Sequence, residues 1–188
     1  MPFVSRAGEK LAFAIQKFGL SISGMVCADF GSSTGGFVDC LLQNGARKIY
    51  AVETGYGVLD WKLRNNERVI VKERTNAMHV TLPEKMDIIT NDTSWTKQEI
   101  ILPNIIRNLK QNGAIMTLIK PHYEADKKLL RHGVLSEEDA EQVTNATLSR
   151  IISLGLTVKG LVKSPIVGKK GGNSEYLAYL ESTITDTV

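Results

Sequence analysis

The sequence predicts an α/β protein built on a mostly parallel, doubly wound sheet. Short apolar segments alternate with segments of helical periodicity along almost the whole chain, as βαβ units require. The run 25–30 stops abruptly at a glycine, as a buried strand does, and the run 114–119 is apolar enough to be buried on both faces. The last two strand-like segments have no helix between them, so we expect them to pair antiparallel.

The N-terminal half should contribute three helices and four strands. We expect Ser5 to cap the first helix and Gly19 to end it, while Asn44-Gly45 closes the second helix. The helices are predicted over 5–18, 35–44 and 58–65, and the strands over 25–30, 48–52, 69–72 and 86–90.

The C-terminal half should add two helices and three strands. Helical spacing continues from 96 to 111, where Asn112-Gly113 should end the helix, with Pro103 either starting or kinking it. Ser136 begins a capping box for a second helix, which Gly155 ends. The strands are predicted over 114–119, 157–162 and 174–181.

Composition indicates one globular domain over residues 1–188, of which residues 1–22 form an N-terminal helical extension. Hydrophobic residues make up 43% of the chain, and no run approaches the roughly 18 apolar residues of a membrane helix. The N-terminus lacks the features of a signal peptide, so we expect a cytoplasmic protein with no membrane partner. The net charge of +3 is compatible with nucleic acid without requiring it.

Neither cysteines nor histidines predict a metal site. Cys27 and Cys40 stand in apolar stretches and belong to no C-x-x-C pattern, so we expect buried free thiols. His79, His122 and His132 show no metal-ligand spacing.

The sharpest local signal is a glycine-rich loop between the first strand and its helix. Glycines there let the backbone approach a ligand, and the following helix N-terminus favours an electronegative group. A P-loop would need a lysine where Phe37 stands, and a dinucleotide-binding loop a glycine where Ser33 stands. The remaining alternatives are a methyltransferase loop and a plain tight turn.

We favour the methyltransferase loop because Glu53 ends the second strand, 22 positions after Gly31. A carboxylate at that place grips ribose hydroxyls in nucleoside-binding folds. The ligand would be S-adenosyl-L-methionine, and its expected contacts are Asp29, Gly31, Ser32, Ser33, Thr34, Gly35, Gly36, Phe37 and Glu53.

Motifs spread over nearly the whole chain carry a family resemblance. They read VSRAGEKL at 4–11, STGGFVDCLL at 33–42, YAVETGYG at 50–57, WKLR at 61–64, ERTNA at 73–77, IKP at 119–121 and NSEY at 173–176. Together they resemble the haemolysin-A-type (TlyA) methyltransferases of the FtsJ-like ribose methyltransferase superfamily. The resemblance implies a Rossmann-like class I methyltransferase fold with a seven-stranded sheet and helices on both faces.

The chain also departs from the family pattern. The family's second-strand aspartate is Glu53 here, and its D-V-S-F motif appears as Asp92-Thr93-Ser94-Trp95. Full-length members carry a small N-terminal S4-type RNA-binding domain, and this chain begins where that domain would end. The resemblance therefore leaves open whether a partner protein supplies RNA targeting.

The resemblance implies a catalytic set of Lys10, Asp92, Lys120 and Glu175, and places Asn76 and Asp92 near the cofactor. A ribose hydroxyl is a very weak acid, so a lysine accepts its proton only if the lysine's own pKa is lowered. A second ammonium and partial burial lower it. We expect Lys120 to be the base, Lys10 its electrostatic partner, and the two carboxylates the orienting groups.

RNA contacts should come from basic and aromatic side chains near this set. Residues 157–174 hold four lysines and no acid, although charge runs are usually solvated faces. Two aromatic residues, each just past a supposed catalytic residue, would either stack on a flipped base or pack in the core. The expected RNA contacts are Arg6, Trp95, Tyr123, Lys163, Lys169 and Lys170.

The leading hypothesis is an S-adenosylmethionine-dependent methyltransferase acting on a ribose 2′-hydroxyl of ribosomal RNA or a ribosomal subunit. One alternative is a methyltransferase of the same fold that acts on a small molecule. Another is a non-enzymatic RNA-binding or ribosome-assembly protein that retains the cofactor pocket. A membrane-lytic haemolysin comes last, because nothing in the sequence would span a bilayer.

Overall fold

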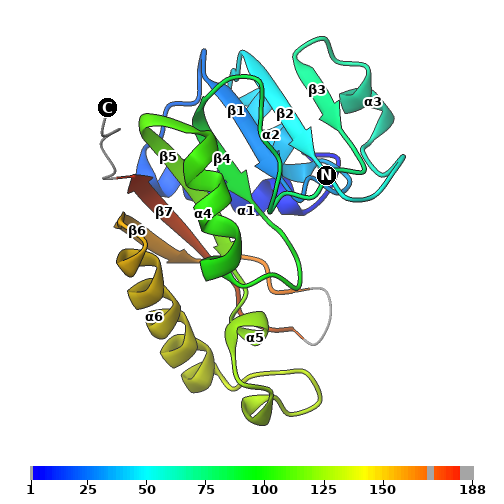
Figure 1. The fold of residues 1–188 in the computed structure, drawn as a ribbon. Coiled ribbons are helices and arrows are strands. Elements are labelled where there is room, and N and C mark those ends of the chain that lie inside the picture. The colour runs from blue at the N-terminus through cyan, green and yellow to red at the C-terminus, as the bar shows by residue number, and fades with distance from the viewer. Residues whose placement is uncertain (1, 169–171, 183–188) are drawn as a thin grey trace.

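A seven-stranded sheet forms the centre of the computed structural model, which describes residues 2–168 and 172–182 (Figure 1). The strands lie in the order β3-β2-β1-β4-β5-β7-β6. The first five in this order are parallel, whereas β7 is antiparallel to both β5 and β6, which confirms the mixed sheet expected. The strands are β1 (Val26–Phe30), β2 (Lys48–Val52), β3 (Val69–Lys72), β4 (Met86–Asn91), β5 (Leu109–Ile119), β6 (Leu156–Lys163) and β7 (Tyr176–Ser182).

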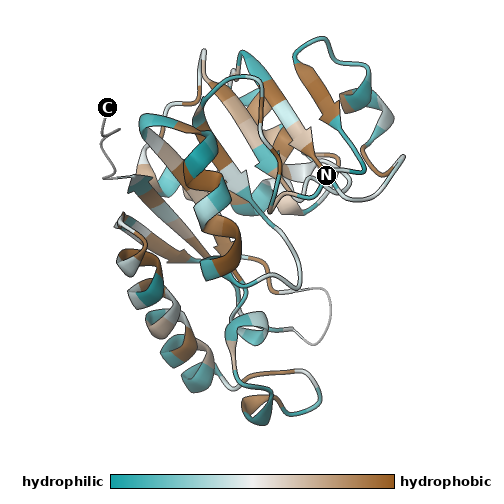
Figure 2. Cartoon of the chain, viewed as in Figure 1, coloured by the Kyte–Doolittle hydropathy of each residue, from teal (hydrophilic) through white to brown (hydrophobic). Residues whose placement is uncertain are grey.

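Helices cover both faces of this sheet, and the interior between the layers is apolar (Figure 2). On one face α1 (Ala7–Phe18) and α2 (Gly36–Gln43) bury their apolar residues, and on the other α4 (Gln98–Asn108) and α6 (Glu137–Ser153) do so. Ile88 and Ile89 of β4 belong to opposite clusters, because successive strand residues point to opposite faces. The connections carry two short helices, α3 (Trp61–Arg64) and α5 (Pro121–Glu124), and a 3-10 turn, η1 (Lys127–Leu129).

Several local signals have the predicted effect. Gly19 adopts a left-handed conformation with φ +62° and ends α1. The Ser136 hydroxyl accepts a hydrogen bond from the Asp139 N–H at 3.1 Å and caps α6. Cys27 and Cys40 are both buried and free. Local chemistry therefore sets these ends as the sequence indicates.

Two helices begin later than predicted. Residue Arg6, not Ser5, precedes the first helical residue, and no side chain caps α1. The predicted helix over 58–65 is the single turn α3, because the Asp60 carboxylate accepts the Lys62 N–H at 2.9 Å and starts the helix there. The residues before Asp60 form a loop of bends, in which Gly57 has φ +68°.

The prediction that Asn112-Gly113 ends a helix is wrong. Helix α4 ends at Asn108, β5 begins at the next residue, and Pro103 lies inside the helix instead of starting it. Asn112 has φ +58°, and a Cβ on Gly113 would lie 2.9 Å from the carbonyl oxygen of Lys110. The pair therefore marks an irregular turn of the backbone within a long strand. In sequence, such a pair resembles the signature that ends a helix.

Candidate active site

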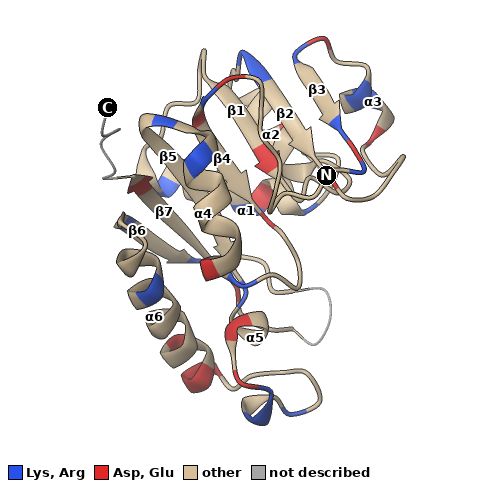
Figure 3. Ribbon diagram, in the orientation of Figure 1, with Lys and Arg blue, Asp and Glu red and all other residues tan. Residues whose placement is uncertain are grey.

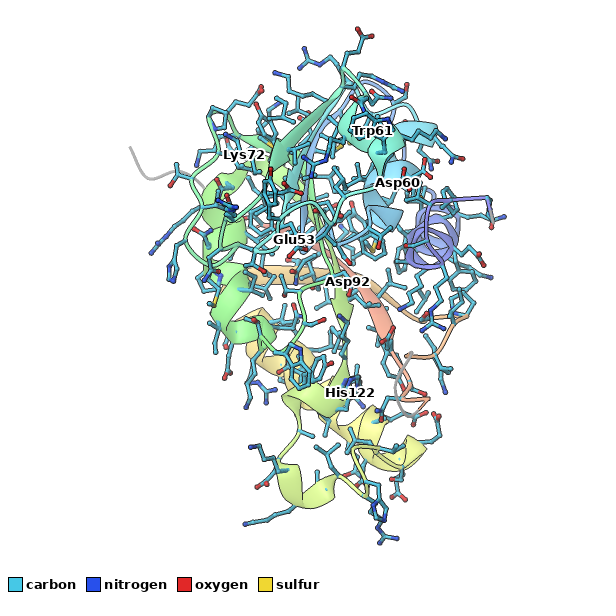
Figure 4. The ribbon with its side chains drawn as sticks, turned by 90° about the vertical axis from the view of Figure 1, so that its right-hand side faces the viewer. Glu53, Asp60, Trp61, Lys72, Asp92 and His122 are labelled. Atoms are coloured by element: carbon cyan, nitrogen blue, oxygen red, sulfur yellow. The ribbon has the colours of Figure 1, made fainter. Side chains whose placement is uncertain are left out.

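A cavity of about 620 Å³ opens at the carboxyl edge of the parallel strands. Ligands of open α/β sheets bind at this edge. The walls come from segment 4–7 and Lys10 of α1, from the loop after β1, from the loops after β4 and β5, and from Glu175 just before β7. Figure 4 looks onto this side of the molecule, where Glu53, Asp92 and His122 follow one another along the face.

The glycine-rich loop lies against the loop that follows β4. Gly31 has φ +82°, and a Cβ there would lie 3.0 Å from the backbone nitrogen and Cα of Thr93. The Gly31 N–H donates to the Val52 carbonyl at 2.9 Å, which ties the loop to β2. Glycine at this position is therefore required by the backbone conformation and by the neighbouring chain.

The other two glycines of the loop face protein. A side chain on Gly35, whose φ is +102°, would collide with Leu63 of α3, and one on Gly36 would collide with Ser5 and the Gly8 backbone. Their small size brings α1 and α3 against the loop. The sequence-based reason for these two glycines, an open approach for a ligand, is therefore incomplete, although Gly36 also lines the cavity.

Glu53 follows β2 and holds the loop through its carboxylate. Oε2 accepts the Ser33 N–H at 2.8 Å, and Oε1 accepts the Gly55 N–H at 2.9 Å and the Thr54 hydroxyl at 3.1 Å. Partial burial alone would raise its pKa, but these hydrogen bonds outweigh that and lower the pKa of Glu53 below its ordinary value. The side chain is thus an ionised acceptor that supports the loop, and it is not among the residues that line the cavity.

Asp29, in β1, is buried beneath the same loop and lines the cavity. Burial raises the pKa of Asp29 to about 8, and the charges of Asp92 and Glu53 add to the rise. A hydrogen bond from the Thr90 hydroxyl at 2.7 Å acts in the opposite direction. Around neutral pH this carboxyl group therefore changes its charge readily.

Lys120 and Asp92 form an ion pair at the ends of two neighbouring strands. Lys120 Nζ lies 2.5 Å from Asp92 Oδ1, 3.3 Å from the Asp92 carbonyl oxygen and 3.3 Å from Ser94 Oγ. Because β4 and β5 are parallel neighbours, the residues that follow them reach the same edge. Both side chains line the cavity, as the sequence predicts.

Lys10 and Glu175 form a second ion pair on the same cavity. Both residues are buried, and Lys10 Nζ contacts Glu175 Oε2 although the two residues are 165 positions apart. A Cβ on Gly168 would lie 3.0 Å from Glu175 Oε1, so the loop before β7 packs closely on this carboxylate. The four residues expected to act together are thus brought to one cavity as two pairs.

Two aromatic rings stand at the mouth of the cavity beside Lys120. The rings of Trp95 and Tyr123 lie 4.8 Å apart at 33°, and Trp95 is 79% exposed. Trp95 also has φ +64°, which is strained for a bulky residue. The core alternative for Trp95 is therefore wrong, and its ring is presented to solvent.

His122 is a cavity residue that the sequence reasoning did not select. It lines the cavity, and its Nδ1 is buried with no hydrogen-bond partner among the described residues. Burial, together with the charge of Lys120, lowers the pKa of His122. The only available signal was its position two residues after Lys120.

Some predicted contacts lie elsewhere. Arg6 lines the cavity, but Lys163 instead pairs with Glu137 at 2.5 Å. Asn76 is exposed, and its amide oxygen accepts the Met78 N–H at 2.9 Å, away from the cavity wall. Lys169 and Lys170 lie outside the described residues.

Residues 2–168 and 172–182 contain neither a candidate metal site nor a candidate membrane span. No group of three or more His, Cys, Asp or Glu side chains there is arranged to hold a metal ion. Over the same residues, no helix has both the length and the apolar character needed to cross a membrane.

Comparison with known proteins gives consistent matches. A family model described as FtsJ-like methyltransferase matches residues 3–182. Hemolysin A of Brachyspira hyodysenteriae is 40% identical, over 94% of this chain and 76% of its own length. The 16S/23S rRNA (cytidine-2'-O)-methyltransferase TlyA of Mycobacterium tuberculosis is 35% identical, over 96% of this chain and 69% of its own length.

A solved structure is similar throughout. The crystal structure of a "putative hemolysin" from Lactococcus lactis has a TM-score of 0.91 and 38% identity, covering 96% of this chain and 89% of that one. The similarity therefore includes both the fold and most of the sequence.

Proposed function

Because this chain belongs to the FtsJ-like methyltransferase family, we propose that it transfers a methyl group from S-adenosyl-L-methionine to a ribose 2′-hydroxyl of ribosomal RNA. The observation that carries the proposal is the pairing of Lys120 with Asp92, and of Lys10 with Glu175, on one cavity beside the glycine-rich loop. The relative from Mycobacterium tuberculosis is named for 2'-O-methylation of cytidine in 16S and 23S rRNA.

The cofactor side of the cavity has the polar groups that such a ligand needs. Ser32 lines the cavity, and its Oγ is a buried hydroxyl without a hydrogen-bond partner among the described residues. Leaving a buried polar group unpaired costs about 1–3 kcal/mol, which a polar ligand would recover. We infer that Asp29, Glu53, Asp92 and loop residues 31–37 hold the cofactor, and that it supplies an electrophilic sulfonium methyl group.

The catalytic side supplies positioning and a proton acceptor. The cavity residues would hold the ribose hydroxyl in line with the methyl group that the cofactor supplies, and the hydroxyl proton would pass to Lys120 Nζ. Only a neutral amine can accept this proton. Asp92 favours the charged ammonium, so its part in this proposal is to orient the Lys120 side chain. The Lys10–Glu175 ion pair also lines the cavity, where it offers a hydrogen-bonding ammonium whose charge is balanced by the carboxylate.

The exposed aromatic rings would receive the target nucleotide. Stacking on aromatic rings is the usual way in which proteins hold unstacked RNA bases. Trp95 and Tyr123 stand beside Lys120, whose Nζ lies 5.9 Å from the Tyr123 ring centre. A base held there would bring its ribose toward Lys120, and Arg6, which also lines the cavity, would contact a phosphate.

Methyl transfer to RNA tests this function. The protein is incubated with methyl-labelled S-adenosylmethionine and either deproteinised RNA or intact ribosomal subunits, and the RNA is then hydrolysed with alkali. We expect label in alkali-resistant dinucleotides, because alkaline cleavage needs a free 2′-hydroxyl. Label confined to base-methylated nucleosides, or no transfer to either substrate, would contradict the proposal.

A further inference from the structure

Outside the cavity, one exposed loop presents large apolar side chains to solvent. Within six residues Tyr56 is 70% exposed, Val58 41% and Trp61 76%. The loop is held in place, since the Asp60 N–H donates to the Thr34 carbonyl at 3.0 Å and the Gly57 N–H to Glu73 Oε1 at 2.8 Å. The exposed side chains therefore stand on a backbone that is held in place, and solvent alone would not favour their exposure.

An arginine is placed on one of these rings at a conformational cost. The guanidinium carbon of Arg74 lies 4.4 Å from the Tyr56 ring centre, and Arg74 has φ +52°. A left-handed backbone is unfavourable for a residue with a side chain, so the surrounding structure must enforce it. Such strain, in a residue that buries nothing, favours a role in binding.

The loop also presents cations that no carboxylate neutralises. Arg74 and the exposed Lys62 have no ion-pair partner among the described residues, whereas Arg64 is paired with Glu73. In Figure 3, basic and acidic segments both lie around α3. Of the nearby acids, Asp60 accepts the Lys62 N–H and Glu73 accepts Arg64. Two cations without a carboxylate partner, beside the exposed rings of Tyr56 and Trp61, complement a negatively charged, base-bearing chain.

This surface continues the face on which the cavity opens. In Figure 4, Trp61 and Asp60 lie beyond Glu53 on the same side of the molecule as Asp92 and His122. A strand whose target ribose reaches Lys120 can therefore extend past the cofactor side of the cavity onto this loop.

We propose that Tyr56, Val58, Trp61, Lys62 and Arg74, together called the aromatic ledge, bind unpaired nucleotides that flank the methylated one. The proposal rests on the proposed RNA substrate. Aromatic faces stack on any base, and arginine and lysine contact the phosphates of the same strand. Stacking needs splayed bases, so the ledge should prefer single-stranded RNA to a duplex.

Tryptophan fluorescence tests the ledge directly. The chain has two tryptophans, so Trp95→Phe leaves Trp61 as the sole emitter while keeping a ring in the cavity. We expect a 12-nucleotide oligouridylate to quench this emission saturably, and an RNA duplex of equal length to quench it far less. Binding seen by fluorescence anisotropy without any change in Trp61 emission would overturn the proposal.

Substitutions in the parent protein provide the second readout. Trp61→Ala should weaken oligouridylate binding by about 10-fold. Arg74→Ala should weaken binding too, and should reduce by roughly 0.7 the slope of the logarithm of the binding constant against the logarithm of salt concentration. Ile152→Ala and Lys127→Ala remove an exposed apolar residue and an exposed cation elsewhere, and should leave both quantities unchanged.

The outcomes separate the ledge from the proposed function. If Trp61→Ala leaves oligouridylate affinity unchanged while the parent still methylates RNA, the ledge is wrong and the function stands. If oligouridylate quenches Trp61 but no methyl transfer occurs, the ledge stands and the function is wrong. If Trp61 emission changes with protein concentration alone and sedimentation shows a dimer, the partner is a second copy and the RNA proposal is overturned.

Discussion

The two sides of the cavity are built in different ways. On the cofactor side, Glu53 binds backbone N–H groups of Ser33 and Gly55, all within one βαβ unit. On the catalytic side, side chains pair across long stretches of chain, with Lys10 and Glu175 165 positions apart and Lys120 28 positions from Asp92.

The difference shows which changes should affect binding and which should affect chemistry. Cofactor-side geometry depends on backbone conformation and on close packing of glycines, so changes there should act on stability and affinity. Catalytic-side geometry depends on charged side chains, so changes there should act on the methyl-transfer step. The predictions below test that division, beginning with the largest expected effect.

Replacing Lys120 should abolish turnover and spare cofactor binding. Lys120→Met keeps the apolar stem without a proton acceptor, so single-turnover methylation should fall by about 10²–10⁴-fold. Lys120→Arg should fail almost as badly, because guanidinium stays protonated at any working pH. Lys127→Met, a change at an exposed lysine outside the cavity, is the control. Near-normal turnover in Lys120→Arg would show that only positive charge is needed.

Enlarging Gly35 should act on stability first. Gly35→Val combines a strained φ with a collision against Leu63, and should cost about 2–4 kcal/mol of unfolding free energy. The matched control is Gly57→Val, which has φ +68° but open space around it, and should cost about 1–2 kcal/mol. Urea unfolding measures both. Equal losses would show that the contact with α3 contributes nothing.

Removing the Glu53 carboxylate should weaken cofactor binding without stopping chemistry at saturation. Glu53→Ala removes the expected acceptor for ribose hydroxyls and should cost about 1–3 kcal/mol of binding free energy. Calorimetry with S-adenosylhomocysteine measures this, with Glu67→Ala, a change at an exposed glutamate, as control. An unchanged dissociation constant would exclude Glu53 from the cofactor site.

Asp29 should make stability depend on pH. Its pKa is about 8 in the folded protein, against about 3.8 ordinarily, so the folded state binds an extra proton between these values. The stabilisation that Asp29 contributes is fully present below about pH 4 and is lost as the pH rises through 8. Over this range the free energy of unfolding falls by at most about 1.4 kcal/mol per pH unit. Asp29→Asn should flatten urea-unfolding profiles between pH 5 and 8, while Glu67→Gln should not. A parent profile already flat there would disprove the raised pKa.

Much of the fold followed from the sequence. The Rossmann-like class I methyltransferase fold and the resemblance to haemolysin-A-type proteins are both confirmed. The errors arose where one local sequence signal is compatible with two different backbone structures. Asn112-Gly113 resembles a helix stop but lies within β5, and Ser5 resembles a cap but instead packs near Gly36. The roles of the cavity residues stay predictions.

By itself the sequence determined the order of strands and helices, the glycine-rich loop and the list of charged candidates. Those features depend on periodicity, on backbone freedom and on capping, which act over a few residues. Only the tertiary structure decided that Lys10 pairs with Glu175, that His122 faces the cavity and that Trp61 is left in solvent. Such contacts depend on which strands become neighbours and how closely the layers pack, because residues distant in sequence meet only after the whole sheet has formed.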